Sequence, residues 1–573
     1  MNCFKNFMYI LSIWFTLFFA CEEKNVRDSA VFAQEQEDQD IPDTDTLDLF
    51  HEKDAAKEKD STYGFSRLDL PENVKPSGIA VIKDEIFIAD INYPSILRTN
   101  IHDGKVLRRV PVKGSFPAGL DFDGETLLST DLFEEHIERY RAFPGDKRSP
   151  LPFYGSQAWG ISSDGNSLYV VDRAKREILK IDREDGSVIS TFPAPGKKPS
   201  AITSDGNRIW VADADSRRIY MMDPEKHWIV HQMDSQVSYP SGLAIYGKEL
   251  LVSDLSGHSI VKTPFFPDKP YSTENWERYE VDFRIIHKVE GDGAVKNLNS
   301  FIAVPQSRPG QKILGDVAFS PEPDEIVTDE WGQKYASFHH ERLETGSELR
   351  INMTVEFETA DLRYAINPEK IPSVFTKGLK NPQKYLRDEK KYDISSETIA
   401  KILKNMKIEE EKGLYAKARK IYEKLAASIT YDLNGGWGRA STVLKRKTGS
   451  CSEYTFSLIS LLRASGIPAR YVGAYVNRAE KGGIDYVFHR WAEIWMGPYY
   501  GWVPVDANAG HEDDILTRAG AFAALPGRYL ITTVSGGESE YMDWSYNYNT
   551  DYSVEGNAVL STHPLAHWKN ISQ

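Results

Sequence analysis

Five repeats between residues 62 and 280 constrain the fold of this chain more than any other feature of its sequence. A small residue recurs at a fixed place in each repeat with a step of 41 residues: Gly78, Gly119, Gly160, Ala201 and Gly242. A strand-ending acid keeps the same step: Asp90, Asp131, Asp172, Asp213 and Asp254. Each unit alternates apolar and polar residues around a tight turn such as Asp164-Gly165. A period near 40 with about four strands per unit predicts a β-propeller over residues 62–280.

The repeat sequences, for example PSAITSDGNRIWVAD and PSGLAIYGKELLVSD, resemble those of NHL-type propellers. The number of blades is expected to be five, with strand 62–69 completing the last blade, or six if a degenerate blade follows. We interpret the repeated aspartates as acceptors for backbone N–H groups at strand ends rather than as metal ligands. No metal or cofactor is expected. A protein or glycan is the expected ligand of the propeller surface, an expectation that rests on architecture alone.

The period is lost from about residue 281, although strand-like segments continue at 302–305, 312–320 and 349–358. These segments predict a β-sandwich-like lead-in domain over residues 281–390, and an extra blade with a linker is the alternative. Apolar residues at helical spacing then run through 395–428. They open a domain over residues 391–573 that we expect to be α+β.

A cysteine stands where a buried helix is predicted to begin. The segment 455–464, TFSLISLLRA, is almost wholly apolar, and Gly466 and Pro468 end it. Cys451 therefore lies at the predicted helix N-terminus, where backbone N–H groups and the helix dipole favour a thiolate.

A predicted hairpin supplies a base and a carboxylate. Residues 486–495 alternate as a strand, 496–501 form a turn and 502–506 form a second strand. This hairpin brings Asp506 towards His489. A thiol, an imidazole and a carboxylate are the nucleophile, base and orienting group of covalent acyl transfer.

The segments GSCSEYTFSLISLLRASGIPARYVGAYV, FHRWAEIW and GWVPVDAN resemble the transglutaminase-like core of the papain-related cysteine enzymes. The resemblance implies that Cys451, His489 and Asp506 form the catalytic triad. Trp437, Ser452 and Trp491 are the candidates for holding the oxyanion or supporting the site. Ser452 stands where the animal enzymes have tryptophan, and nothing resembles their calcium sites, so thiol chemistry is more firmly implied than cross-linking.

The N-terminus reads as an export signal. Lys5 precedes an apolar run from Phe7 to Ala20, and a cysteine follows at 21. Residues 1–21 resemble a bacterial lipoprotein signal peptide, which implies a lipid on Cys21; a plain signal peptide is the alternative. Residues 22–61 are charged and predict a solvated tether. We therefore expect an envelope protein, periplasmic or on the cell surface, held to the membrane by its N-terminal lipid.

The chain has three cysteines, and removing the signal and acylating Cys21 would leave Cys451 as the one free thiol. Its formal net charge of −15 argues against nucleic acid as a partner. We expect a tethered cysteine enzyme that acts on amide bonds of proteins or peptides through a thioester, with water or an amine as acceptor. The alternative is a non-catalytic binding or scaffold protein that works through its propeller.

Overall fold

The structure is a computed structural model that describes residues 64–572 except 113–114, 142–146, 435 and 480–481. The predicted signal, Cys21 and all of the predicted tether lie outside these residues. Among the described helices, none has the length and apolar character needed to cross a membrane.

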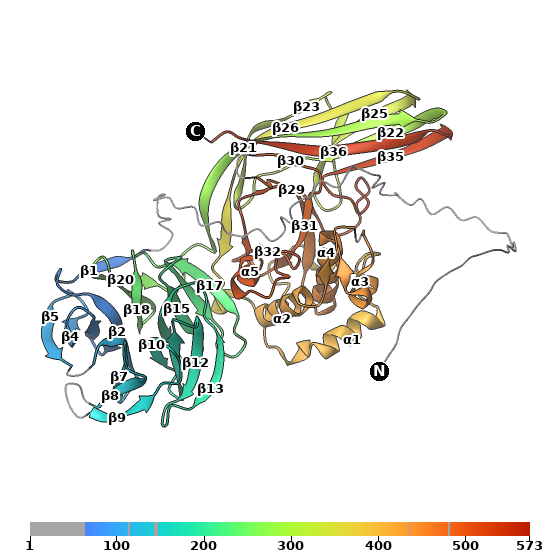
Figure 1. Cartoon of the computed structure of the whole chain (residues 1–573). Helices are drawn as coiled ribbons and strands as arrows, with labels where there is room; N and C mark the ends of the chain where they lie inside the picture. The colour runs from blue at the N-terminus through green and yellow to red at the C-terminus, as the bar shows by residue number, and fades with distance from the viewer. Residues whose placement is uncertain (1–63, 113–114, 142–146, 435, 480–481, 573) are drawn as a thin grey trace, which may run out of the picture. The chain divides into compact units, whose positions relative to one another are not determined.

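Five four-stranded antiparallel sheets form the first part of the described chain (Figure 1). Four are built from consecutive strands, and the fifth joins β18, β19 and β20 to β1 from the start of the fold. Their strands are β1 (Ser66–Asp69), β2 (Pro76–Ile82), β3 (Glu85–Asp90), β4 (Ser95–Asn100), β5 (Val106–Pro111), β6 (Pro117–Phe122), β7 (Thr126–Asp131), β8 (His136–Arg141), β9 (Lys147–Pro152), β10 (Ala158–Ser163), β11 (Ser167–Asp172), β12 (Glu177–Asp182), β13 (Val188–Pro193), β14 (Pro199–Ser204), β15 (Ile209–Asp213), β16 (Arg218–Met222), β17 (Ile229–Asp234), β18 (Pro240–Tyr246), β19 (Glu249–Asp254) and β20 (Ser259–Pro264). The pairing of β1 with β20 confirms that the first strand completes the last blade, and the described blades number five.

The repeated small residues explain how the propeller closes. The first strands of the five blades, β2, β6, β10, β14 and β18, contact one another in a ring. A Cβ added to Gly119 would lie 2.3 Å from the carbonyl oxygen of Trp159 in the next blade, and one on Gly78 would lie 2.3 Å from that of Ala118. Ser77 and Ser200 donate hydrogen bonds from one blade to the next. The 41-residue step of small residues is therefore a requirement for close backbone approach at the centre of the ring.

The repeated aspartates accept hydrogen bonds from backbone N–H groups. Asp131 accepts from the N–H groups of Phe116 and Phe133, and Asp254 accepts from those of Ser238 and Tyr239. Equivalent bonds reach Asp90, Asp172 and Asp213. The interpretation as strand-end acceptors is thus confirmed, and no group of three metal-ligating side chains occurs in the described part of the chain.

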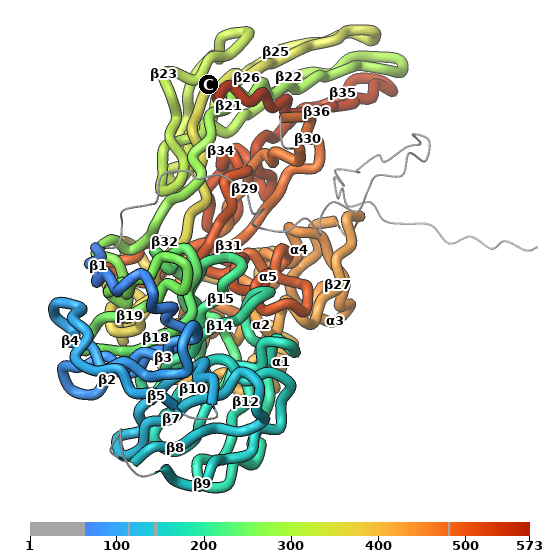
Figure 2. The backbone as a smooth tube through the Cα atoms, turned by 60° about the vertical axis from the view of Figure 1, so that its left-hand side comes forward, coloured from blue at the N-terminus to red at the C-terminus, as the bar shows by residue number. Residues whose placement is uncertain are grey.

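Two layers of long strands follow the propeller (Figure 2). One sheet has the order β23-β26-β21-β36-β30, with β33 paired to β26, and the other has the order β24-β25-β22-β35. Their strands are β21 (Tyr271–Glu290), β22 (Gly293–Ala303), β23 (Gln311–Ser320), β24 (Glu325–Thr328), β25 (Lys334–Glu344), β26 (Glu348–Tyr364), β30 (Ile484–Asp485), β33 (Ala524–Leu525), β35 (Tyr548–Gly556) and β36 (Val559–Asn570). The long strands therefore come from both ends of the region after the propeller.

The remaining elements are a cluster of helices, a four-stranded sheet of order β32-β31-β29-β34 and a two-stranded parallel sheet of β27 and β28. Helix α4 packs on β29 and β31 and also contacts α1, α2 and α3. The elements are α1 (Glu397–Asn405), α2 (Leu414–Ala426), β27 (Thr430–Tyr431), α3 (Ala440–Arg446), β28 (Thr448–Gly449), α4 (Cys451–Ala464), β29 (Ala469–Val476), β31 (His489–Trp495), β32 (Trp502–Val505), α5 (Ile515–Gly520) and β34 (Tyr529–Ser535), with 3₁₀ turns at Pro368–Lys370, Pro382–Tyr385 and Ile408–Glu410. Each side chain of α4 from Cys451 to Arg463 is buried, as its apolar sequence predicts.

The long sheets and the helix-bearing sheet share one hydrophobic core. Phe283 of β21 stacks on Tyr475 of β29 with ring centroids 4.6 Å apart, and the same cluster continues into α4. Two features differ from the predicted boundaries. β21 begins at Tyr271, before residue 281, and the C-terminal strands β35 and β36 pair with β22 and β21 rather than with the helix-bearing sheet. The reason is that the C-terminal strands β35 and β36 extend the two long sheets, although they are distant in sequence from β22 and β21.

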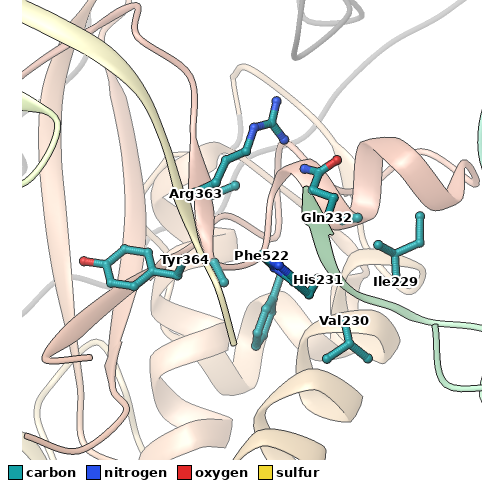
Figure 3. A pocket seen from close by; sticks show the side chains of 10 residues that line it. Ile229, Val230, His231, Gln232, Arg363, Tyr364 and Phe522 are labelled. Atoms are coloured by element: carbon teal, nitrogen blue, oxygen red, sulfur yellow. The ribbon is translucent and has the colours of Figure 1, made fainter. Parts of the chain in front are cut away.

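Contacts also join β17 of the propeller to the helices. Arg419 of α2 donates to the carbonyl oxygen of Ile229, and Lys226 pairs with Glu411. A cavity of about 20 Å³ lies beside Ile229 and Phe522 (Figure 3). That volume holds about one water molecule, so it excludes a substrate.

Candidate active site

Helix α4 presents Cys451 in its first turn. The Glu453 carboxylate accepts hydrogen bonds from the N–H of Ser450 at 3.1 Å and the N–H of Gly438 at 2.7 Å, and it pairs with Arg446 at 2.6 Å. The Ser450 hydroxyl donates to the carbonyl oxygen of Gly436. A carboxylate that reaches back to the N-cap residue fixes the direction in which the helix starts, and it therefore fixes the position of Cys451.

The Cys451 thiol is buried beside the His489 side chain. Burial alone would raise its pKa, but the hydrogen bond from His489 and the charges of His489 and Arg490 lower the pKa below the ordinary value of 9.0. The N–H of Arg490 also points at the sulfur. The local field therefore favours a thiolate.

His489 is placed by the turn that precedes β31. Asp485 accepts hydrogen bonds from the N–H groups of Val487 and Phe488, and Phe488 adopts a left-handed φ of 62°. The strand therefore starts at His489 rather than at residue 486 as the alternation predicts, because these three residues form a turn held by Asp485. The His489 ring stacks on Trp491 and Tyr529, with centroids 5.8 Å away in both cases.

Asp506 lies just beyond the end of β32 and meets the imidazole. Its Oδ2 is 2.6 Å from His489 Nε2, while Oδ1 accepts from the N–H groups of Asn508 and Ala509. Burial would lower the pKa of His489, but the charge and hydrogen bond of Asp506 raise that pKa well above 6.5. Because Nε2 is engaged by Asp506, Nδ1 is the ring nitrogen left to meet Cys451. The predicted hairpin is present, and its register places Trp495 opposite Trp502.

A buried arginine stands directly after the histidine. The Arg490 guanidinium lies 4.2 Å from the ring centroid of Tyr546, 4.6 Å from Tyr471 and 5.0 Å from Phe456. Nη2 donates to the carbonyl oxygen of Trp544, while Nε and Nη1 have no hydrogen-bond partner among the described residues. Aromatic faces thus hold this cation at close range to the thiol.

The three predicted support residues lie at different places. Trp491 stacks on His489, Ser452 is buried in the first turn of α4, and Trp437 is 39% exposed with its ring 5.2 Å from the Arg490 guanidinium. The structure therefore places Trp437 beside the Arg490 cation.

Besides Arg490, sequence reasoning missed two residues that lie against the thiol or the base. The side chain of Tyr546 lies beside Cys451, and this tyrosine packs so closely on Gly473 that a Cβ there would lie 2.5 Å from its ring. Tyr529 stacks on His489. Both follow the hairpin in sequence and carry no motif of their own. The glycine of YVGAYV was the one available signal, because a glycine within a strand marks close approach of another group.

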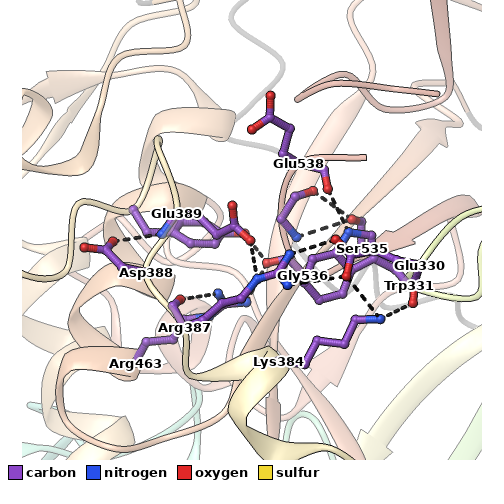
Figure 4. A network of polar contacts seen from close by, with 12 residues as sticks. Glu330, Trp331, Lys384, Arg387, Asp388, Glu389, Arg463, Ser535, Gly536 and Glu538 are labelled. Atoms are coloured by element: carbon purple, nitrogen blue, oxygen red, sulfur yellow. Dashed lines mark hydrogen bonds and ion pairs between the residues drawn. The ribbon is translucent and has the colours of Figure 1, made fainter. Parts of the chain in front are cut away.

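The far end of helix α4 is anchored by a second polar network (Figure 4). Arg463 donates to the carbonyl oxygens of Arg387, Ala469 and Gly536. Its guanidinium also lies 4.5 Å from the ring centroid of Tyr392. Both ends of the helix that carries Cys451 are therefore fixed by buried charged side chains.

Comparison with known proteins identifies the domain that holds these three residues. Residues 401–507 match the family model described as the transglutaminase-like superfamily, a range that includes Cys451, His489 and Asp506. The chain therefore contains a transglutaminase-like domain, preceded by a propeller-like array of four-stranded sheets. A search of curated proteins found no match.

Several solved structures are similar to parts of the chain. A candidate cysteine protease from Cytophaga hutchinsonii is 15% identical, with a TM-score of 0.36, and the match covers 52% of this chain and 99% of that one. The glutaminyl cyclase of Myxococcus xanthus is 13% identical, with a TM-score of 0.32 and coverages of 35% and 93%. The virginiamycin B lyase of Staphylococcus aureus is 22% identical, with a TM-score of 0.25 and coverages of 34% and 67%.

Proposed function

We propose that the protein is a cysteine enzyme that cleaves or transfers amide acyl groups through Cys451, His489 and Asp506. The observation that carries the proposal is the chain of contacts from the Cys451 thiol to the His489 imidazole and on to the Asp506 carboxylate. The distance from His489 Nε2 to Asp506 Oδ2 is 2.6 Å. The lowered pKa of Cys451 and the raised pKa of His489 favour a thiolate and an imidazolium before substrate arrives.

The first half of the reaction forms a thioester. The thiolate attacks the carbonyl carbon of a carboxamide or peptide bond, and backbone N–H groups in the first turn of α4, including that of Cys451, hold the oxyanion. The tetrahedral intermediate collapses as the carbon–nitrogen bond breaks and the imidazolium of His489 gives its proton to the leaving amine. Asp506 keeps the imidazole oriented throughout.

The second half releases the acyl group. Neutral His489 takes a proton from water or from an incoming amine, which attacks the thioester and expels the Cys451 thiolate. Water gives a carboxylic acid, and an amine gives a new amide. The triad serves both acceptors.

The test incubates the protein with glutamine-containing proteins and a fluorescent primary amine. Label incorporation supports acyl transfer, and release of ammonia or peptides without label supports hydrolysis. Cys451→Ser serves as the control and should abolish both. Turnover that survives in Cys451→Ser would show that this site is not the catalytic one.

We also propose that the enzyme is lipid-anchored in a bacterial cell envelope and that its propeller recruits a protein or glycan. The lipoprotein-type signal and the repeat architecture support these assignments. Metabolic labelling with an alkyne fatty acid should mark the chain and should be lost in Cys21→Ala. Equal labelling of both chains would rule out Cys21 as the attachment point.

A further inference from the structure

A cavity of about 380 Å³ lies between the loop after β22 and the sheet that carries His489. The volume is within the usual range for small-ligand sites. Its charged lining residues are two arginines, Arg308 and Arg470, and its walls include Trp331, Tyr500 and Trp502. A chain with a net charge of −15 thus builds a pocket whose charged lining is entirely positive.

The two arginines share one buried carboxylate. Arg470 donates two hydrogen bonds to Glu493 Oε2, at 2.9 and 2.7 Å, and Arg308 binds Oε1. Glu493 is 1% exposed, whereas the two arginine side chains keep 19% and 18% of their surface. The cluster therefore carries one net positive charge, and its cationic members are the ones that reach the cavity.

The single carboxylate of Glu493 does not fully neutralise the positive charges of Arg308 and Arg470. Burial and the nearby Arg308 lower the pKa of Arg470 despite its bond to Glu493. A second carboxylate at the cavity side would relieve that deficit and would meet planar guanidinium donors suited to bind it.

The aromatic walls are held in place. The Arg470 guanidinium stacks over Trp502 at 4.2 Å from its ring centroid. Trp331 donates from Nε1 to the carbonyl oxygen of Glu538 at 2.9 Å, and Lys384 and Arg387 lie over its ring (Figure 4). Fixed indole surfaces beside a cation suit an anionic group attached to an apolar or aromatic body.

The pocket also lies on the face of β31 that carries the candidate base. His489, Trp491 and Glu493 are alternate residues of one strand, so their side chains point to the same face. Four residues of strand span roughly 13 Å. A bound peptide could therefore occupy the same side of the sheet as His489.

We propose that this cavity binds a carboxylate of a peptide chain, with Arg308 and Arg470 as donors and the indole rings of Trp331 and Trp502 against the adjoining side chain. One net positive charge matches a carboxylate monoanion. The carboxylate comes from the chain terminus or from an acidic side chain. The assignment concerns binding alone and does not depend on the catalytic role of Cys451.

Fluorescence anisotropy on the full-length Cys451→Ala protein tests the assignment without turnover. The probes are fluorescein-labelled Gly-Ala-Ala-Phe with a free carboxylate, its C-terminal amide, and an amide-ended Gly-Glu-Ala-Phe. We expect the free acid to bind at least about tenfold more tightly than its amide, which is about 1.4 kcal/mol. Tight binding of the glutamate peptide would assign the carboxylate to a side chain.

Two variants locate the site. Arg308→Gln should weaken binding of the free-acid peptide at least about tenfold. Ser307→Asp should weaken it to the same extent, because it adds a negative charge beside the site without breaking the arginine–glutamate cluster. Arg284→Gln, at an exposed ion pair on β21, should have no effect. Thermal unfolding checks that each variant is folded.

The result that overturns the proposal is equal binding of acid and amide, or no binding of any peptide up to millimolar concentration. Unchanged affinity in a folded Ser307→Asp variant also overturns it. Displacement of the probe by inorganic phosphate at concentrations where acetate has no effect would favour a phosphate site instead.

Discussion

Arg490 is a buried cation that lies beside the candidate nucleophile. Its side chain is fully buried and makes one described hydrogen bond, while three aromatic rings lie within 5.0 Å of the guanidinium. A buried cation without a carboxylate partner is costly. Here it neighbours a thiol whose ionised form it favours.

Replacing Arg490 should therefore raise the pKa of Cys451. In Arg490→Met the loss of one positive charge should slow iodoacetamide labelling of Cys451 about three- to tenfold at mildly acidic pH, since one pKa unit is a tenfold change in thiolate. Arg490→Lys should retain part of the effect. Labelling that stays unchanged in Arg490→Met would show that the cation has only a packing role.

At the scale of elements, the N-terminus of α4 depends on one buried carboxylate. Glu453 binds two backbone N–H groups and Arg446. Glu453→Ala leaves those groups without their acceptor, and we expect a loss of roughly 2–4 kcal/mol in the free energy of unfolding. Urea denaturation measures it. Glu410→Ala, an exposed residue of a 3₁₀ turn, is the control, and equal stability of the two variants would contradict this role.

The propeller blades carry a separate prediction. Gly119→Ala places a methyl group 2.3 Å from the Trp159 carbonyl oxygen, which forces neighbouring blades apart. We expect it to cost about 1–3 kcal/mol, the usual range for overpacking. Scanning calorimetry measures the loss of stability. Gly64→Ala, where a Cβ meets nothing within 4 Å, is the control and should leave the stability unchanged. A Gly119→Ala chain as stable as the parent would mean that the ring does not close through this contact.

At the scale of the whole molecule, the boundary after the propeller can be tested by deletion. β21 starts at Tyr271 and is paired on both sides, by β26 and β36. A chain lacking residues 64–265 should keep a cooperative thermal transition and small-substrate turnover but lose preference for macromolecular substrates. A chain lacking residues 64–280 loses half of β21 and should fail to fold. Unchanged preference in the first chain would refute substrate recruitment by the propeller.

The sequence predicts best those parts of the molecule where local pattern and spacing carry the information. The 41-residue step predicts the blades because close approach admits only small residues, and the apolar run after Cys451 predicts a buried helix. The hairpin from His489 to Asp506 is short, so alternation and a turn at 496–501 predict that it forms, and the structure supplies its register.

The remaining features depend on contacts between distant segments. β36 joins β21 across nearly 300 residues, and Tyr546 reaches Cys451 from beyond the hairpin. No periodicity records such pairings. The arginine–glutamate cluster is likewise invisible in sequence, because Arg308 and Glu493 meet only when the two sheets pack together.

The most direct test of the account measures the rate of Cys451 alkylation against pH in a chain that begins at residue 22. The same chain with Cys451→Ser is the control. Because the pKa of Cys451 is lowered, its thiolate fraction falls only when the pH drops through that lowered pKa. The alkylation rate should therefore be flat around neutrality and should fall only in acid. In His489→Ala the alkylation rate at pH 7 should drop about tenfold or more. The pH at which the rate begins to rise should move up towards the pKa of an ordinary thiol. Identical profiles for the parent and His489→Ala would contradict the thiolate–imidazolium pair on which the proposed function rests.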